Sequence, residues 1–576
     1  MRSVFLWAAI VAISATLLVS TDTLGETRRT APVSLAVAAV RSDLPPNAPE
    51  VLLGDRLFFE TRFAQFFYEH SRGDVNSRSS GGDPITEEVP LEPGGHFLGV
   101  GAGSLRGPFR GSGINCRQCH LGDDFIATKP LAQRTYCDFA RRSPVPYRGD
   151  GITNTVRNSP VMVNLGLPRE SPLLLHFDGE FSSVEDLVFA TLTGRNYGWL
   201  SHERPTAIAH IASVIRQDAG QNARRFISSF GDGVPYKIAL LGADPTLPPS
   251  LRIPPEYRIE VASASDEQIV WAIGKLIHAY MNSLRFGKDN TQRESEAPYD
   301  LFLRRNSLPN QPRAGEAGLE YSARLLRAIE SRRQFIWINP ADAQFSLHAQ
   351  DYQFGRSELD GLKIFLQRSH GKRHIGNCVS CHVPPQFTDS KVHNTGVSQA
   401  EYDEIFGPGA FITLHVPGLA ERSANFDYYM PKTYLHPNAT SRFRSAPVAE
   451  KAGFADLGTW NVLANPDFPS PQSALIEVLC PKAPRYTSCE PESLLSHAIA
   501  TFKTPTVRDL GHSGPYFHSG AASSIESVVR FYVEMSRSMR GGGLRNGSPE
   551  MAHIFIDSTD VTPLVAFLRT LNEDYH

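Results

Sequence analysis

The sequence predicts a mainly α-helical protein made of two related halves with long loops. A cysteine motif occurs twice, as CRQCH at 116–120 and as CVSCH at 378–382. A longer segment also repeats, because HFDGEFSSVEDLVFAT at 176–191 aligns without gaps to FHSGAASSIESVVRFY at 517–532. Each copy has a Gly turn, then Ser-Ser, then a run typical of a capped helix. The simplest interpretation is an internal duplication.

The cysteine motif defines what each half holds. C-x-x-C-H is the attachment signal for c-type haem. Two thiols three positions apart on a turn can form thioethers with the two vinyl groups of one porphyrin, and the adjacent His points at the iron. We therefore predict two haem c groups in two cytochrome c-like haem domains with insertions. Their attachment residues and proximal ligands are Cys116, Cys119 and His120 for the first haem, and Cys378, Cys381 and His382 for the second.

Other uses of these cysteines fit less well. Two C-x-x-C pairs could hold one zinc ion, but such sites space their pairs by roughly 15–20 residues. Neither zinc nor local disulfides explain the His after each pair. Of the remaining cysteines, Cys480 and Cys489 are expected to form a disulfide and Cys137 to be a buried thiol.

Composition and the N-terminus bound the class of protein. The chain has 576 residues, 41% of them hydrophobic, and a net charge of −3, so we expect a sizeable core and no nucleic-acid partner. Arg2 precedes an apolar run from Val4 to Val19, and small residues follow. This pattern predicts a secretory signal peptide at 1–25 and a periplasmic protein. The alternative is an uncleaved N-terminal anchor.

The two halves begin with related helices. Gly54 and Phe58 in LGDRLFFE match Gly361 and Phe365 in SELDGLKIFLQ. Residues 72–113, rich in Gly, Ser and Pro, separate Phe58 from the first cysteine motif and predict a long inserted loop. We expect an N-terminal haem domain with insertions at 26–340 and a C-terminal haem domain at 341–576.

Capping signals and periodicity predict four further helices. Ser265 and Gln268 form a capping box before one of them, and Pro563 should be the first helical residue of the C-terminal one. The repeats predict the boxes Ser182-x-x-Glu185 and Ser523-x-x-Glu526, with the second helix ending before Gly541. The predicted inward faces are Ile269, Ile273, Leu276, Ile277, Tyr280 and Leu284, and Leu564, Phe567, Leu568 and Leu571.

The helix of the second repeat carries candidates for a sixth iron ligand. Ile525, Val528, Val529 and Tyr532 share one face, which should look towards the second haem. Periodicity alone leaves Tyr532 as a ligand or as an ordinary core aromatic, with Met535 and Met539 as rival ligands. Thr191 stands in the place of Tyr532 in the first repeat, and Thr is not a haem ligand. The first iron is therefore predicted to be open for chemistry, and the second to be saturated and to relay electrons.

Together these features resemble the bacterial di-haem cytochrome c peroxidases and their MauG-type relatives, over residues 50–576. The supporting segments are LGDRLFFE, CRQCH, RNSPVMVNLG, HFDGE, APYDLFL, CVSCH, FTDSKVHNTGV and FKTPTVRDLGHSGPYFHSGAASSIESVVRFY. The resemblance implies a helical two-domain protein with haems at the domain interface. It implies a calcium ion between them, held by the Asn158 side chain and the carbonyls of Ser513 and Pro515. It also places the axial ligand of the second haem, Met in peroxidases and Tyr in MauG, at Tyr532.

Three positions depart from the peroxidase pattern. Phe177 replaces the Trp that usually lies between the haems, and Trp199 is the candidate substitute. The distal His has no match, and Asp150 lies near its position. The distal Glu is not evident either, so the candidates for the catalytic proton donor are Tyr197, Arg195 and His176. Di-haem rubber oxygenases, which resemble the same family, also have an open first haem and lack the peroxidase distal set.

The leading hypothesis is a periplasmic di-haem enzyme that reduces hydrogen peroxide at the first haem. Electrons would come through the second haem from a small cytochrome c or cupredoxin. One alternative is a MauG-like or oxygenase enzyme that uses peroxide or oxygen on an organic or protein substrate. Another is a non-enzymatic electron-transfer cytochrome with two six-coordinate irons. A homodimer is a further expectation, because the resembled peroxidases commonly dimerise.

Overall fold

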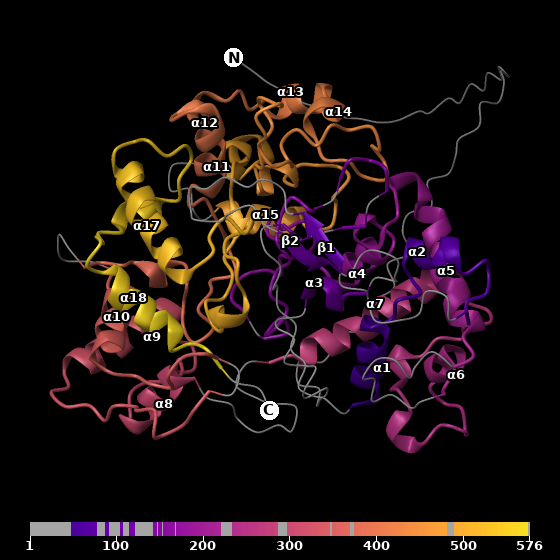
Figure 1. Cartoon of the computed structure of the whole chain (residues 1–576), viewed down its shortest axis with the longest axis horizontal. Coiled ribbons are helices and arrows are strands. Elements are labelled where there is room, and N and C mark those ends of the chain that lie inside the picture. The colour runs from indigo at the N-terminus through magenta and orange to yellow at the C-terminus, as the bar shows by residue number, and fades with distance from the viewer. Residues whose placement is uncertain are drawn as a thin grey trace, which may run out of the picture. The chain divides into compact units, whose positions relative to one another are not determined.

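The computed structural model describes residues 48–573, apart from the ranges given at the end of this paragraph. The predicted signal peptide, most of the inserted loop and Cys137 lie outside the described residues. Residues Val40–His576 form one compact unit. As predicted, the described chain is mainly helical, with short strands (Figure 1). The ranges left out are 78–86, 91–103, 108–114, 121–141, 144, 147, 153, 168, 221–232, 286–296, 346–347, 369–373 and 481–488.

The elements fall into two series that each carry one cysteine motif. The first comprises α1 (Pro49–Phe58), α2 (Gln65–His70), α3 (Arg117–His120), α4 (Val184–Leu192), α5 (Arg204–Gln217), α6 (Tyr236–Leu241) and α7 (Asp266–Ser283). The second comprises α8 (Pro298–Arg305), α9 (Gly318–Glu330), α10 (Arg356–Leu366), the 3₁₀ helix η6 (Cys378–Ser380), α17 (Ile525–Arg540) and α18 (Val561–Arg569).

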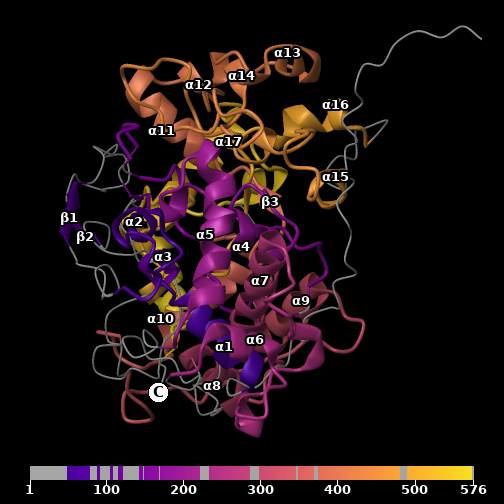
Figure 2. The ribbon, with the colours of Figure 1, turned by 90° about the vertical axis from the view of Figure 1, so that its right-hand side faces the viewer.

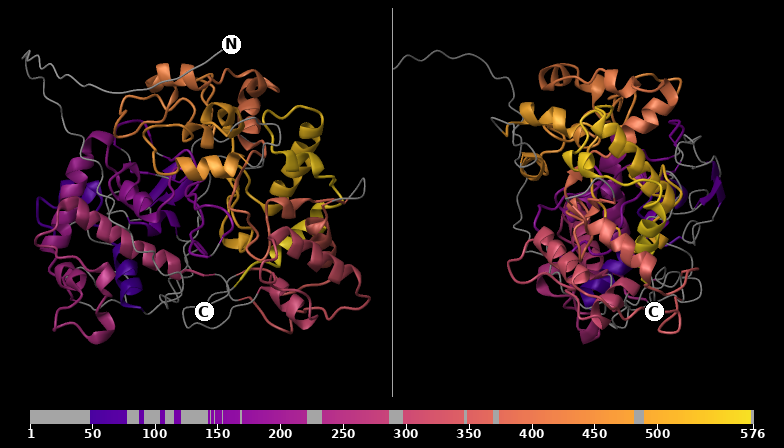
Figure 3. Two further views of the ribbon diagram at one scale, coloured as in Figure 1. Left: turned by 180° about the vertical axis from the view of Figure 1, so that it is seen from behind. Right: turned by 90° about the vertical axis from the view of Figure 1, so that its left-hand side faces the viewer.

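An insertion at residues 397–500 interrupts the second series. It contains α11 (Val397–Phe406), α12 (Ala410–Thr413), α13 (Leu419–Ala424), α14 (Phe426–Tyr429), α15 (Gln472–Leu479) and α16 (Pro491–Leu494). Figures 2 and 3 show these helices, in orange, gathered at the top of both views. The strands pair as two antiparallel ribbons, β1 (Glu87–Pro90) with β2 (Ser104–Gly107) and β3 (Val392–His393) with β4 (Phe502–Lys503). The first ribbon lies inside the predicted inserted loop.

Each half is built on one close helix crossing. Helix α1 packs on α7, and α10 packs on α18 (Figure 1). A Cβ on Gly54 would overlap the carbonyl oxygen of Leu276, and a Cβ on Gly361 would overlap that of Pro563. Aromatic rings close both crossings, since the centroids of Phe58 and Tyr280 are 5.1 Å apart and those of Phe365 and Phe567 are 5.2 Å apart. The shared Gly-x-x-x-Phe pattern therefore reflects one packing arrangement used twice.

The longer repeat has the same backbone in both copies. An isolated bridge joins Leu175 to Phe181 in the first copy, and another joins Tyr516 to Ala522 at the matching positions. Matching turn residues have positive φ, with His176 at 59° and Phe517 at 67°. A serine then caps each following helix, Ser183 for α4 and Ser524 for α17. The two segments that align in sequence therefore also have equivalent structures.

Reciprocal backbone hydrogen bonds join the two halves. The Asn158 amide donates to the His518 carbonyl at 2.7 Å, and the Lys503 amide donates to the Phe177 carbonyl at 2.6 Å. Phe177 and His518 occupy equivalent positions of the long repeat. Asn158 and Lys503 are also equivalent, because each stands two residues before the proline in RNSP and FKTP. The halves thus contact each other through a pseudo-two-fold exchange.

Three large buried apolar clusters form most of the described interior, beside a small fourth one made of Val397, Ala521, Ala522 and Phe531. The first core lies within residues 48–284 and the second within residues 299–571. The third core is formed mainly by the insertion and also takes in Leu174 from the first half. Residues Tyr299 to Ile338 pack in the second core, which favours a boundary before α8. The predicted boundary after residue 340 stays a prediction.

The predicted helices are present, with shifts at their starts. Ser265 and Gln268 form the predicted capping box of α7, and the predicted inward faces of α7 and α18 are buried. The repeat helices start one residue later than predicted, since Ser183 and Ser524 are the caps instead of Ser182 and Ser523. Pro563 is two residues inside α18, because that helix begins at Val561. Within the described residues, no helix is long and apolar enough to span a membrane.

Candidate haem sites and active site

The second cysteine motif opens into a largely apolar cavity. The cavity is lined by all three residues of this motif that are predicted to hold haem, Cys378, Cys381 and His382. Helix α17 contributes the four residues predicted to share its inward face, Ile525, Val528, Val529 and Tyr532. A thiol pair, an imidazole and an apolar wall are the groups that a covalently attached porphyrin requires. The residues present therefore fit haem c.

Tyr532 lies in the cavity of the second cysteine motif. It lines the same cavity as His382, and Met535 and Met539 do not. The sulfur of Met535 lies near Gly396, and that of Met539 near Gly547. Burial raises the pKa of the Tyr532 phenol, and the nearby Cys381 and Cys378 thiols add to the effect. Of the three candidates that periodicity left open, this arrangement favours Tyr532.

His382 is neutral and oriented. Its Nδ1 lies 3.2 Å from the Phe387 carbonyl oxygen. Burial lowers the pKa of this imidazole, which favours the neutral form that can bind a metal. A hydrogen bond from Nδ1 to a carbonyl fixes which nitrogen is left for the metal.

The cysteine motifs do not behave as zinc or disulfide sites. Cys116, Cys119, Cys378 and Cys381 are all outside disulfides. Cys116 packs against the first core and Cys378 against the second, so the two pairs do not converge on one ion. The predicted disulfide between Cys480 and Cys489 is present, with the Cα atoms 5.5 Å apart.

The first cysteine motif is half-buried beside Tyr197. The Tyr197 hydroxyl lies 3.2 Å from the Cys116 sulfur, and its ring is only 2% exposed. Burial lowers the pKa of His120 to about 4, with a further contribution from the charge of His176. His120 is therefore a neutral imidazole, as a proximal haem ligand must be. Because Tyr197 contacts the haem-attachment thiol, it packs at the edge of the predicted porphyrin.

The other two candidate proton donors have separate partners. Arg195 pairs with Asp150, with Nε to Oδ2 at 2.9 Å and Nη2 to Oδ1 at 3.1 Å. His176 Nδ1 lies 2.9 Å from Glu180 Oε2. His176 lines the pocket between the halves. The structure brings Arg195 together with Asp150, the residue nearest to the missing distal His, and leaves Tyr197 and His176 elsewhere.

A buried ion-pair network lies behind His176. Arg157 contacts Asp178 at 2.5 Å and Asp456 at 2.6 Å, and Arg444 contacts Glu180 at 2.5 Å. His176, Asp178 and Glu180 are close enough to hold a metal ion. The two arginines already neutralise both carboxylates, so this cluster is an ion-pair network.

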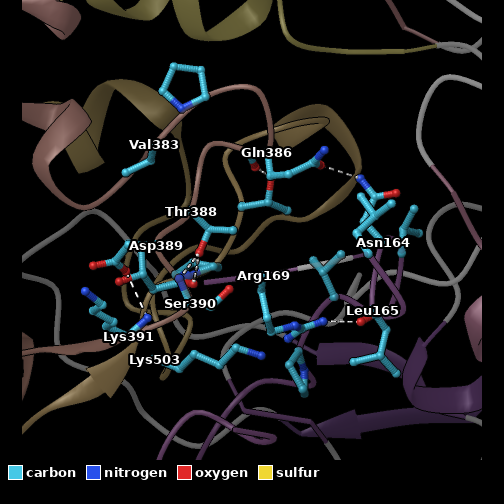
Figure 4. Close-up of a pocket in the computed structure, with 18 of the residues that line it drawn as sticks. Asn164, Leu165, Arg169, Val383, Gln386, Thr388, Asp389, Ser390, Lys391 and Lys503 are labelled. Atoms are coloured by element: carbon cyan, nitrogen blue, oxygen red, sulfur yellow. Dashed lines mark hydrogen bonds between the residues drawn. The ribbon is translucent and has the colours of Figure 1, made fainter. Parts of the chain in front are cut away.

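Phe177 lies where electrons would pass between the halves. It lines the second cavity and also the pocket between the halves that is shown in Figure 4. Trp199, the candidate substitute, is instead buried in the first core, where its indole N–H donates to the Phe63 carbonyl at 3.1 Å. Trp199 lines neither described cavity.

The implied calcium ligands are only partly arranged for a cation. Asn158, Ser513 and Pro515 all line the pocket between the halves. The Asn158 side-chain nitrogen, however, donates to the Pro515 carbonyl at 2.8 Å, and its oxygen accepts from the Arg142 amide at 2.9 Å. Calcium binds oxygen ligands, so in this arrangement the Asn158 amide does not fit the ion.

Two residues near the predicted haem sites were not predicted from the sequence motifs. His393 lines the second cavity, with Nδ1 3.6 Å from the Cys381 sulfur and Nε2 2.8 Å from Asp389 Oδ2. Lys503 lines both cavities. A comparison of RNSP with FKTP could have found Lys503, because it shows a lysine at the position of Asn158.

Comparisons with known proteins agree with these sites. The chain matches no protein-family model. It is 26% identical over 215 residues to the cytochrome-c peroxidase IdrP2 of Denitromonas iodatirespirans, which covers 37% of this chain and 39% of that protein. It is 39% identical over 74 residues to the methylamine utilization protein MauG of Methylorubrum extorquens, which covers 13% of this chain and 19% of that protein. These matches confirm the resemblance to the di-haem cytochrome c peroxidase and MauG group.

The matched segments span less than half the length of these relatives. Among solved structures, the diheme peroxidase BthA from Burkholderia thailandensis gives a TM-score of 0.42 at 15% identity, over 93% of this chain and 87% of that one. A MauG-like protein associated with microbial copper homeostasis gives 0.41 at 16% identity, over 92% and 91%. Structural likenesses this distant support no statement about function.

Proposed function

We propose that the chain is an exported di-haem c oxidoreductase that reduces hydrogen peroxide at its first haem site. Electrons enter through the second site from a small cytochrome c or cupredoxin. The observation that carries the proposal is the asymmetry of two equivalent sites. Tyr532 lines the cavity of the second motif, and the equivalent residue on α4 is Thr191, which cannot coordinate iron.

Haem c, when bound, supplies an iron that exchanges electrons and that can activate peroxide wherever a coordination position is open. The chain's own residues would attach each haem and supply its iron ligands. Cys116 and Cys119, and Cys378 and Cys381, hold the porphyrins, while His120 and His382 each present a neutral nitrogen. Tyr532 fills the remaining position of the second site. The Arg195–Asp150 pair is our candidate for the proton shuttle at the first site, because the guanidinium holds the Asp150 carboxylate ionised and oriented, so that it can accept a proton from one oxygen of peroxide and return it to the departing oxygen.

Cyanide binding and His120→Ala test this proposal. Cyanide should bind one of the two ferric haems, because one iron is open and one is saturated. His120→Ala should abolish peroxide turnover and leave the spectrum of the second haem unchanged. Turnover retained in His120→Ala would mean that the sites have opposite roles. Failure of cyanide to bind would favour the electron-transfer cytochrome with two saturated irons.

A MauG-like oxidation of an organic or protein substrate is the second candidate. The placement of Tyr532 favours it, because a phenolate is a hard anionic donor that stabilises oxidised iron, whereas Met raises the potential. A spectroelectrochemical titration separates the two. A high-potential second haem would indicate a Met ligand in place of Tyr532 and support a peroxidase fed by a cytochrome, and two low-potential haems, one of them high-spin, would support Tyr532 as the ligand and MauG-like or oxygenase chemistry.

The proposed function includes two further proposals, a calcium site and a periplasmic location. The resemblance supports calcium at Asn158, Ser513 and Pro515, although the Asn158 amide must turn to present its oxygen. Elemental analysis of purified protein tests this site, because about one calcium ion per chain would support it and none would refute it. The apolar run at residues 4–19 supports export. Homodimerisation is a separate proposal, which light scattering tests.

A further inference from the structure

Lys503 stands at the junction of the second haem cavity and the pocket between the halves. Its backbone is fixed by β4 and by the hydrogen bond to Phe177. Figure 4 shows its side chain extending towards Arg169, which lines the same pocket. Among the described residues that line the second cavity, Lys503 is the only Lys or Arg.

The positive charges at this junction are not balanced by the acids around them. Burial and the nearby charge of Arg169 together lower the pKa of Lys503 to about 7. Arg169 also lowers the pKa of Arg285, after burial. Arg169 donates a hydrogen bond to the Leu165 carbonyl, which carries no net charge. Two neighbouring cations in a half-buried pocket, without an acidic partner among the described ion pairs, call for an anion.

The acids of the same pocket are engaged elsewhere or exposed. Asp389 contacts His393 at 2.8 Å, and Glu316 pairs with Arg324 at 2.6 Å. Glu170 is exposed on the pocket rim. The remaining titratable groups on the pocket wall are Lys391, His176 and Tyr516, of which His176 pairs with Glu180 and the Tyr516 hydroxyl donates to the Leu510 carbonyl. None of the described ion pairs reaches Lys503 or Arg169.

We propose that Lys503 and Arg169 bind the propionate carboxylates of the second haem. This inference rests on the proposed function, since it requires haem at Cys378 and Cys381. Thioether bonds hold the vinyl edge of a porphyrin at these cysteines, and the two propionates leave from the opposite edge. Two carboxylates in an apolar cavity need counter-charges, and Lys503 is the Lys or Arg that the cavity offers. The equivalent residue of the first half is Asn158, so this counter-charge belongs to one site only.

Replacing Lys503 should change the redox potential of the second haem. A nearby cation favours the reduced iron, which carries one positive charge fewer. In Lys503→Met protein carrying both haems, the potential of the second haem should fall by at least 59 mV, which corresponds to a tenfold change in the equilibrium constant for one electron. Lys503→Arg should keep the wild-type potential. Lys391→Met is the matched control, because Lys391 lines the pocket but not the haem cavity.

An unchanged second-haem potential in Lys503→Met would overturn the proposal. If that variant does not load haem, Arg169→Gln takes its place. The potential of the second haem should fall in this variant too, and an unchanged potential would equally overturn the proposal. Inorganic phosphate separates a free oxyanion from the propionates. A wild-type potential that is insensitive to phosphate supports the propionates, and a saturable shift that is lost in Lys503→Met refutes them. Failure of the proposed function itself would appear earlier, as wild-type protein without a second haem spectrum.

Discussion

The role proposed for Tyr532 at the second site depends on a single oxygen atom, that of its hydroxyl. The residue reaches the cavity that His382 lines, and its phenolate would bind ferric iron strongly. Tyr532→Phe should therefore raise the potential of the second haem and alter its absorption spectrum. Met535→Leu is the control and should change neither. A Tyr532→Phe spectrum identical to wild type would remove Tyr532 as a ligand.

Glu60 links the stability of the first half to pH. Burial would raise the pKa of its carboxyl, but the charge and hydrogen bonds of Arg62 outweigh burial and lower it to about 2. Because this value is below the usual 4.5, the stabilisation is complete above about pH 4.5 and is lost as the pH falls towards 2. It amounts to about 3 kcal/mol. Acid unfolding should become less steep in this window in Glu60→Gln, and an unchanged slope would contradict the assignment.

At the scale of elements, the α10–α18 crossing depends on the missing side chain of Gly361. Alanine usually stabilises a helix interior by about 1 kcal/mol relative to glycine. Here the added Cβ would overlap the Pro563 carbonyl oxygen, and overpacking of this kind costs about 1–3 kcal/mol or more. Gly361→Ala should therefore lower the thermal midpoint. Gly541→Ala is the control, because a Cβ there meets its nearest atom at an ordinary 3.5 Å.

The same elements show what sequence can and cannot predict. Periodicity placed the face of α17 correctly, because helix geometry is local and the burial of Ile525 and Val529 follows from it. Cap positions were wrong by one residue, since adjacent serines offer the same hydroxyl and only the backbone selects between them. The salt bridge of Arg157 with Asp456 joins positions far apart in the chain, and no local pattern contains it. Lys503 was missed for the same reason, since its meaning depends on Arg169.

At the scale of the molecule, Arg157 connects the first half to the insertion. Its guanidinium contacts Asp178 and Asp456, whose side chains are at most 3% exposed. Arg157→Met leaves buried carboxylates without this partner, which typically costs 3–5 kcal/mol. Denaturant unfolding should show this loss. Arg530→Met removes an exposed pair with Glu526 and should cost less than about 1 kcal/mol. Equal effects of both variants would mean that the network is not a structural link.

The exchange of backbone hydrogen bonds between Asn158 and His518 and between Lys503 and Phe177 has the form of an isologous contact, in which each partner gives what it receives. Two identical subunits meet in this way, and mutation then changes both copies at once. Fusion of the copies into one chain removes that constraint. One copy can keep a tyrosine where the other has a threonine, and a lysine where the other has an asparagine. Covalent linkage of two equivalent units thus allows them to differ at these positions.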